Sequence, residues 1–169
     1  MKIIGLVGWS GSGKTTLIVS LIPVLRSLGL RVSTLKHAHH DFDIDHPGKD
    51  SYEHRAAGAS EVLVSSSRRW ALVHEHNDMA ESSLDELLTR LSPTDLVIIE
   101  GFKRHEHDKI EIHRKGGREL LAKNDDRIIA VASDEPLNDL NIPNLDLNDV
   151  ESVADFIVKH CSLKTHGKQ

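Results

Sequence analysis

The feature that most constrains the fold of this chain is a glycine-rich segment close to its start. Residues Gly8–Thr15 read G-x-x-x-x-G-K-[ST], after the apolar run Ile3–Val7 and before the largely apolar run Thr16–Ile22. This order predicts a buried strand, a tight loop and a helix that begins at the loop. Small residues let the loop's backbone N–H groups surround phosphate oxygens, and the helix N-terminus adds its dipole. The segment therefore predicts a phosphate-binding loop for a nucleotide.

Several residues of this loop have an expected chemical role. Lys14 has the reach to contact β- and γ-phosphates, and the Thr15 hydroxyl is a ligand for Mg²⁺. No G-x-S-x-G elbow surrounds the two loop serines, so they are not read as catalytic nucleophiles. The nucleotide-binding residues expected in this segment are Ser10, Gly11, Ser12, Gly13, Lys14, Thr15 and Thr16.

The rest of the chain alternates apolar runs with helical patterns. This order predicts an α/β protein with a three-layer P-loop NTPase fold, whose mostly parallel sheet carries added antiparallel edge strands. Ile110 and Ile112 alternate with polar residues, so a half-exposed strand is expected at 109–113. The other strands are expected at 30–36, 61–65, 70–74, 96–99 and 128–132, and helices at 14–28, 50–57, 84–91 and 149–160.

Length, charge and cysteine content limit the class of protein. A chain of 169 residues fits one nucleotide-binding domain, expected over 1–163, with a frayed tail at 164–169. The net charge of −5 lacks the basic footprint of a nucleic-acid-binding protein. No apolar run approaches the roughly 18 residues of a membrane span. Cys161 is the one cysteine, which excludes an internal disulfide and fits a cytoplasmic protein.

The second half of the nucleotide site is expected after the apolar run at 96–99. That run ends in Glu100 and Gly101, and P-loop proteins place a carboxylate at such a strand end to hold Mg²⁺. We expect Glu100 to act with Thr15 on the metal, and the Gly101 N–H to approach the γ-phosphate. The alternative is a loop acid without a ligand.

Asp134 follows the last buried strand, where open α/β sheets bind their ligands. A carboxylate there accepts hydrogen bonds from guanine N1 and its amino group, which favours guanine over adenine. The usual N-K-x-D guanine signature is absent, and Asp134 also fits the start of a turn at Glu135-Pro136. Both interpretations stay open.

A histidine-rich loop follows the second expected strand. A polar loop at this position in P-loop GTPases is a switch that orders around the γ-phosphate and Mg²⁺. Histidines with carboxylates are also ligands for Zn²⁺ or Ni²⁺, and an ordinary solvated loop is the third interpretation. The residues considered for a switch or for contact with an anionic ligand are Lys36, His37, His39, His40, Asp41 and Lys49.

Several segments together resemble the MobB family of molybdopterin-guanine dinucleotide biosynthesis. They are Trp9–Thr16, Leu35–Asp41, Pro47–Tyr52, Arg69–Leu72, Glu100–Lys103 and Ala130–Asp134. The resemblance implies a homodimeric GTP-binding adaptor with weak GTPase activity that uses GTP and Mg²⁺. The implied partner is the molybdopterin guanylyltransferase (MobA-type) enzyme, which joins GMP to molybdopterin. Molybdopterin itself is a further expected ligand.

Two other functions compete with this one. A small-molecule kinase of this fold needs an Arg-bearing lid, and Arg114, Lys115 and Arg118 around two glycines are candidates for it. A charged hairpin or loop is the other interpretation of these residues. A metal-delivery GTPase is the other alternative, because the sequence has 12 histidines. No convincing catalytic glutamine or arginine finger is found, so slow hydrolysis is expected.

Overall fold

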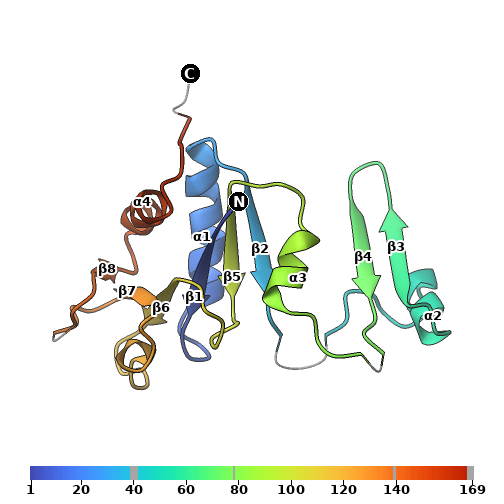
Figure 1. Ribbon diagram of the computed structural model, residues 1–169, viewed down its shortest axis with the longest axis horizontal. Helices are drawn as coiled ribbons and strands as arrows, with labels where there is room; N and C mark the ends of the chain where they lie inside the picture. Colours follow the sequence, from blue (N-terminus) through green and yellow to red (C-terminus); the bar gives the residue numbers. More distant parts are fainter. Residues whose placement is uncertain (39–41, 78, 139, 167–169) are drawn as a thin grey trace. The chain divides into compact units, whose positions relative to one another are not determined.

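The computed structural model describes residues 1–38, 42–77, 79–138 and 140–166. These residues form two compact units (Figure 1). The first unit consists of Met1–His37 and Leu88–Gln169, and the second of Ala38–Leu87. Helix α3 (Leu84–Thr89) spans the boundary between them in the sequence. The single domain expected over 1–163 stays a prediction.

The first unit is built on a six-stranded sheet in the order β2-β5-β1-β6-β7-β8. All its strand pairs are parallel, which explains the continuous apolar runs of the central strands. The strands are β1 (Lys2–Val7), β2 (Val32–Lys36), β5 (Leu96–Glu100), β6 (Lys109–His113), β7 (Ile128–Ser133) and β8 (Asn144–Asp146). The mostly parallel P-loop NTPase sheet predicted from the sequence is confirmed.

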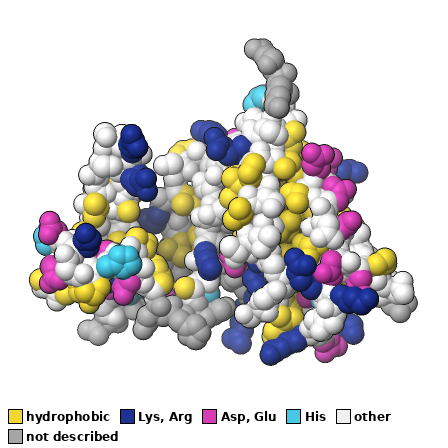
Figure 2. Space-filling view, turned by 180° about the vertical axis from the view of Figure 1, so that it is seen from behind, with side chains coloured by type: hydrophobic (Ala, Val, Ile, Leu, Met, Phe, Trp, Pro, Cys, Tyr) yellow, Lys and Arg dark blue, Asp and Glu magenta, His cyan; other side chains and the backbone are white. Residues whose placement is uncertain are grey.

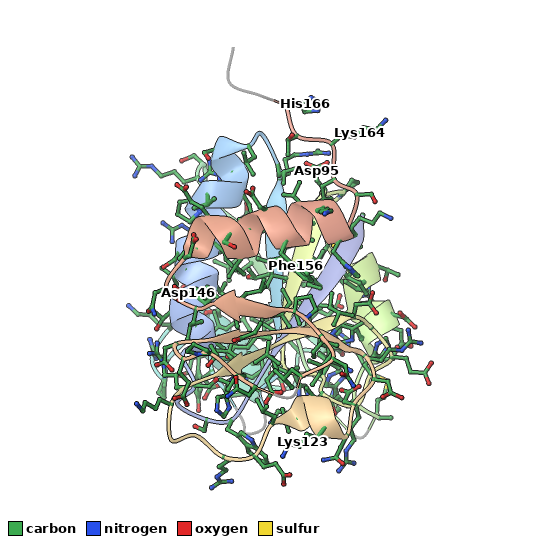
Figure 3. The ribbon with its side chains drawn as sticks, turned by 90° about the vertical axis from the view of Figure 1, so that its left-hand side faces the viewer. Asp95, Lys123, Asp146, Phe156, Lys164 and His166 are labelled. Atoms are coloured by element: carbon green, nitrogen blue, oxygen red, sulfur yellow. The ribbon has the colours of Figure 1, made fainter. Side chains whose placement is uncertain are left out.

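The main core lies where the sheet meets helices α1 (Lys14–Ser27) and α4 (Val150–His160). Leu21 and Leu25 of α1 and Ile157 of α4 are fully buried in one cluster with Ile4 and Ile98 of the strands. Gly29, at φ +82°, follows α1, as expected for a helix stop. The Asp149 carboxylate caps α4 by accepting from the Ser152 N–H at 3.0 Å. Figure 3 shows α4 in front of the sheet with Phe156 labelled.

The expectation of a half-exposed strand at 109–113 is wrong. Strand β6 lies between β1 and β7, and its residues Lys109 to Ile112 are all buried. The polar side chains tolerate burial because each has partners: Lys109 Nζ donates to Asp125 at 3.0 Å, and the Glu111 carboxylate accepts two backbone N–H groups at 2.9 Å. The alternation of polar and apolar residues along β6 therefore reflects one apolar face and one hydrogen-bonded polar face, both of them buried.

Two short elements of the first unit were not expected. Strand β8 extends the sheet at its edge. The other element is the 3-10 helix η1 (Leu121–Lys123), whose first two N–H groups donate to the Glu111 carboxylate. Figure 3 places Lys123 of η1 at one end of the sheet and Asp95 at the other. The backbone N–H of Arg31 donates to Asp95 at 2.7 Å. That bond and the Arg31 side chain hold the pKa of Asp95 below its usual range.

The second unit contains a separate antiparallel pair of strands. Strands β3 (Glu61–Ser65) and β4 (Trp70–His74) pair with Leu63 opposite Leu72, and both strands keep the bounds expected from the sequence. Ser66 closes the connecting turn, because its hydroxyl accepts from the N–H groups of Arg68 and Arg69. The antiparallel strands expected at a sheet edge thus form their own two-stranded sheet (Figure 1).

Helix α2 (Asp50–Ala56) precedes this pair and begins at the residue expected from the sequence. Lys49 is its N-cap residue, and Glu53 reaches back to accept from the Gly48 N–H at 3.2 Å. Arg55 of α2 gathers acidic side chains of the same unit: its guanidinium donates to Asp43 at 2.8 Å and to Asp45 and Glu75 at 2.7 Å. No helix among the described residues is long and apolar enough to cross a membrane.

Candidate functional site

The glycine-rich loop lies at the carboxyl end of β1, between the central strand of the sheet and α1. Gly8, Gly11 and Gly13 have φ values of +148°, +80° and +98°, a region that side-chain-bearing residues rarely adopt. At Gly8 a Cβ would also lie 2.5 Å from the carbonyl oxygen of Ile112. Gly11 faces open space, with no atom within 4 Å of a Cβ built there. The glycines therefore provide both the turn and an open approach to the loop backbone.

Lys14 lies at the start of α1 and folds back over the loop. Its ammonium group donates to the carbonyl oxygens of Gly8 at 3.1 Å and Trp9 at 3.0 Å. Partial burial lowers the pKa of Lys14, the carboxylate of Glu100 opposes that shift, and the charges of Lys103 and Lys36 add to it. Glu100, Lys103 and Lys36 thus lie within electrostatic range of Lys14. Figure 2 shows Lys and Arg side chains gathered along the lower edge of the first unit, where the strands end.

On the β5 side of the loop, two segments singled out in the sequence come together. The His37 N–H donates to the Glu100 carbonyl at 2.9 Å, and the Lys36 ammonium lies 3.9 Å from the Glu100 carboxylate. Gly101, at φ +100°, allows this approach, because a Cβ there would lie 2.8 Å from Cβ of His37. The rings of His37 and Phe102 then pack with their centroids 4.6 Å apart.

The residues present fit a magnesium ion and a phosphate group. The Glu100 side chain is 14% exposed, and Thr15 is exposed at the first turn of α1. A carboxylate and a hydroxyl are hard oxygen ligands of the kind that Mg²⁺ prefers. The open loop at Gly11, the Lys14 ammonium and the N-terminus of α1 supply what a phosphate group needs.

On the β6 and β7 side of the loop, Arg114 connects two strand ends. Its Nε donates to the carbonyl oxygen of Ser12 at 3.2 Å, and its Nη1 donates to the Asp134 carboxylate at 3.2 Å. The other carboxylate oxygen of Asp134 accepts the Lys115 N–H at 2.7 Å. That backbone N–H, with the charge of Arg114, holds the pKa of Asp134 below its usual range.

Sequence reasoning missed this contact of Arg114 with the loop, because it considered Arg114 only as a lid candidate of a kinase or as part of a charged hairpin or loop. The signal available was the position of Arg114 immediately after one strand and of Asp134 immediately after another. Adjacency of β6 and β7 brings these two positions together. Of the other lid candidates, the Arg118 guanidinium lies 5.0 Å from the centre of the Trp9 ring.

Trp9, the second residue of the loop, borders a cavity of the first unit. Its indole N–H donates to the carbonyl of Glu119 at 2.9 Å, and the Lys103 ammonium lies 5.0 Å from its ring centre. The cavity has a volume of about 560 Å³, within the range of small-molecule sites. Its walls come from Val7 and Trp9, the segment 103–106, Lys109 and the segment 119–127.

The histidine-rich loop is only partly covered by the structure. His39, His40 and Asp41 lie outside the described residues. Among the residues that are described, no group of three or more His, Cys, Asp or Glu side chains is arranged to hold a metal ion. Asp43 and Asp45, two acidic residues that follow in the same segment, both form ion pairs with Arg55.

The sheet order and the glycine loop define a protein of the P-loop NTPase class. Within this class, residues 3–134 match the model of the family "Molybdopterin guanine dinucleotide synthesis protein B", or MobB. The chain belongs to this family.

Curated relatives and solved structures agree with this assignment. The chain is 48% identical over 165 residues to the molybdopterin-guanine dinucleotide biosynthesis adapter protein of Escherichia coli K12, covering 94% of this chain and 93% of that protein. It is 41% identical to the Haemophilus influenzae adapter protein, over 93% of this chain and 88% of that one. A crystal structure of molybdopterin-guanine biosynthesis protein B superimposes with a TM-score of 0.74 at 31% identity, covering 95% of this chain and 99% of that one.

Proposed function

We propose that this protein is a GTP-binding adaptor in molybdopterin-guanine dinucleotide biosynthesis, with weak GTPase activity at most. Family membership supports a role in this pathway, because the curated relatives are adapter proteins of the same biosynthesis. The observation that carries nucleotide binding is the open loop Gly8–Thr15, whose Lys14 side chain folds back over the loop and whose end forms the N-terminus of α1. The setting is the cytoplasm, which a chain with one cysteine fits.

In this proposal the phosphates lie over the loop from Ser10 to Thr16. Lys14 leaves the carbonyl oxygens of Gly8 and Trp9 to contact the β- and γ-phosphates, while Mg²⁺ is held by Thr15 and Glu100. Bound Mg²⁺ neutralises phosphate charge. The Gly101 N–H stands at the end of β5 for the γ-phosphate. Asp134 lies at the end of β7 and is the candidate that the sequence offers for guanine selection.

The experiment uses calorimetry to measure the equilibrium binding of GTP and of ATP, each with Mg²⁺, to the wild type and to Lys14→Ala. We expect a clear GTP preference that the variant loses together with most of the affinity. Lys159→Ala, which removes an exposed lysine of α4, is the matched control and should bind like the wild type. Equal binding of the two nucleotides would contradict a GTP-specific adaptor, and no binding at all would contradict the nucleotide site.

Hydrolysis is expected to be slow, because no residue of the described site is arranged as a water-positioning glutamine. The one glutamine of the sequence is Gln169. Single-turnover cleavage of GTP tests this point, and a rate above about 1 s⁻¹ would indicate an enzyme and not an adaptor.

The partner of the adaptor is proposed to be a MobA-type molybdopterin guanylyltransferase. Co-sedimentation of this protein with that enzyme, with and without GTP, is the direct test. We also propose that Lys36, whose side chain is 64% exposed, contacts molybdopterin. A Lys36→Ala variant should then bind molybdopterin more weakly while it retains GTP.

A homodimer is proposed through the antiparallel strand pair β3–β4. A lone two-stranded sheet is marginally stable in water, and here one face presents Leu63 and Trp70, each 62% exposed, beside Leu72, 40% exposed. A second copy of the chain would cover this apolar face. Sedimentation velocity should show a dimer that Leu63→Lys dissociates, while Val19→Lys on α1, 64% exposed in the wild type, leaves it intact.

A further inference from the structure

The guanidinium of Arg114 contacts the phosphate-binding loop although Arg114 follows strand β6, far from the loop in the sequence. Its Nη2 and Nε lie 3.0 and 3.1 Å from the position that a Cβ would take at Gly13. Gly13 is the N-cap residue of α1 and adopts the left-handed conformation. The contact therefore places a permanent positive charge beside the helix N-terminus, where phosphate oxygens are expected to bind.

The hydrogen bonds of Arg114 leave part of its donor set available. Nε is engaged by the Ser12 carbonyl and Nη1 by Asp134, whereas Nη2 makes no hydrogen bond with the described residues. The Arg114 side chain is 44% exposed. A guanidinium held at two points with a third nitrogen free is suited to a charge-assisted hydrogen bond with a phosphate oxygen.

The order of the strands indicates which phosphate this nitrogen would reach. Glu100 and Lys36 end β5 and β2, on one side of β1, and form the metal side of the loop. Arg114 and Asp134 follow β6 and β7, on the other side. Arg114 thus lies away from the metal side and over Gly13, the part of the loop whose N–H groups surround the α- and β-phosphates.

We propose that Arg114 is a nucleotide-contacting residue that binds an α- or β-phosphate oxygen through Nη2. In this inference, Asp134 is the positioning residue that holds the guanidinium over Gly13. The inference rests on the proposed nucleotide site and assigns to Asp134 a role other than direct reading of the guanine base. Both oxygens of Asp134 already accept hydrogen bonds from Arg114 and Lys115, which agrees with a positioning role.

The test compares the affinities of GTP, GDP and ATP for the wild type, Arg114→Ala, Arg114→Lys and Asp134→Asn, measured by calorimetry with Mg²⁺. Arg114→Ala should weaken GTP and GDP by the same factor, about tenfold, the lower end expected for a charged hydrogen bond at a half-exposed site. Arg114→Lys keeps the charge but loses the fork, and should recover only part of the loss. Asp134→Asn should weaken GTP and ATP to the same extent, about threefold.

Several outcomes would overturn this inference. A larger loss for GTP than for GDP in Arg114→Ala would move the contact to the γ-phosphate. A loss confined to GTP, with ATP unchanged, in Asp134→Asn would show that the carboxylate reads the base directly. Unchanged affinities in Arg114→Ala, beside a wild type that binds GTP and a Lys14→Ala variant that does not, would remove Arg114 and leave the proposed function standing. Failure of the wild type to bind any nucleotide would instead overturn the proposed function, and this inference with it.

A stability measurement on the same variants distinguishes direct contact of Arg114 with the nucleotide from a merely structural role. Urea unfolding without nucleotide reports the contribution of the Arg114–Asp134 pair to the fold. Equal affinity losses for GTP and GDP in a variant that is fully folded at the assay temperature support the contact. The binding measurement is repeated at a temperature well below unfolding. If the loss of nucleotide affinity then disappears, Arg114 has only a structural role and the proposal is overturned.

Discussion

A buried histidine should make the stability of the first unit depend on pH. His107 is 4% exposed, and its Nε2 makes no hydrogen bond with the described residues. Burial, followed by the charges of Lys109 and His105, lowers the pKa of His107 from 6.5 to about 4. The folded protein thus holds a neutral imidazole that the unfolded chain protonates at mildly acidic pH.

The sign and size of the effect follow from these two pKa values. Between pH 6.5 and pH 4 the unfolded state binds the additional proton, so stability is present above pH 6.5 and is lost as the pH falls toward the folded pKa. Going from pH 7 to pH 5, linkage with these values lowers the free energy of unfolding by about 2 kcal/mol. At a typical slope this moves the urea midpoint by about 1 M.

The assay is urea unfolding at pH 7, 6 and 5, followed by fluorescence of Trp9 in a Trp70→Phe background, so that the signal reports the first unit. His107→Leu removes the titrating group and should flatten this part of the pH dependence, whatever its effect at pH 7. His46→Gln changes an exposed histidine of the second unit and should retain the full dependence. A dependence of equal slope in His107→Leu and the wild type would refute the reasoning.

Other packing contacts of the first unit give three further expectations, each measured by urea unfolding at pH 7. A Cβ at Gly5 would lie 2.5 Å from Nε2 of His107, so Gly5→Ala should destabilise by about 2 kcal/mol. Asp125→Ala leaves the buried Lys109 ammonium without its partner and should cost about 3 kcal/mol, whereas Lys109→Met should be nearly neutral. If both variants destabilise equally, the unpaired charge is not the cause. Glu111→Gln weakens two backbone hydrogen bonds to η1 and should cost about 2 kcal/mol, with faster amide exchange at those N–H groups.

The sequence predicted best what depends on neighbouring residues along the chain. The glycine loop, the helix that follows it and the strands of the second unit were all expected at nearly the observed bounds, because turn chemistry and apolar runs are local signals. Strand β8 was missed, since Asn144–Asp146 has three residues and no apolar run. Its place at the sheet edge depends on pairing with β7, which is a contact between distant segments.

The error at 109–113 has the same physical origin. Alternation of Lys109, Ile110, Glu111 and Ile112 is the usual pattern of a strand with one face in water. In this protein the polar face is covered by the segment after the strand, which supplies Asp125 and the N–H groups of η1. Nothing in the strand's own residues shows that such partners exist, so the burial of Lys109 could not be inferred from its pattern.

The pairing of charges around the loop bears on how a nucleotide would bind. On one side the Lys36 ammonium lies near Glu100, and on the other Arg114 is bound to Asp134. Lys36 and Arg114 therefore each lie beside a carboxylate, which orients their N–H donors before a phosphate group binds. Because Asp134 occupies Nη1 of Arg114 and leaves Nη2 open, a phosphate oxygen that binds Nη2 does not displace the carboxylate. The geometry of the loop, more than its total charge, then decides the affinity, in agreement with a chain whose net charge is −5.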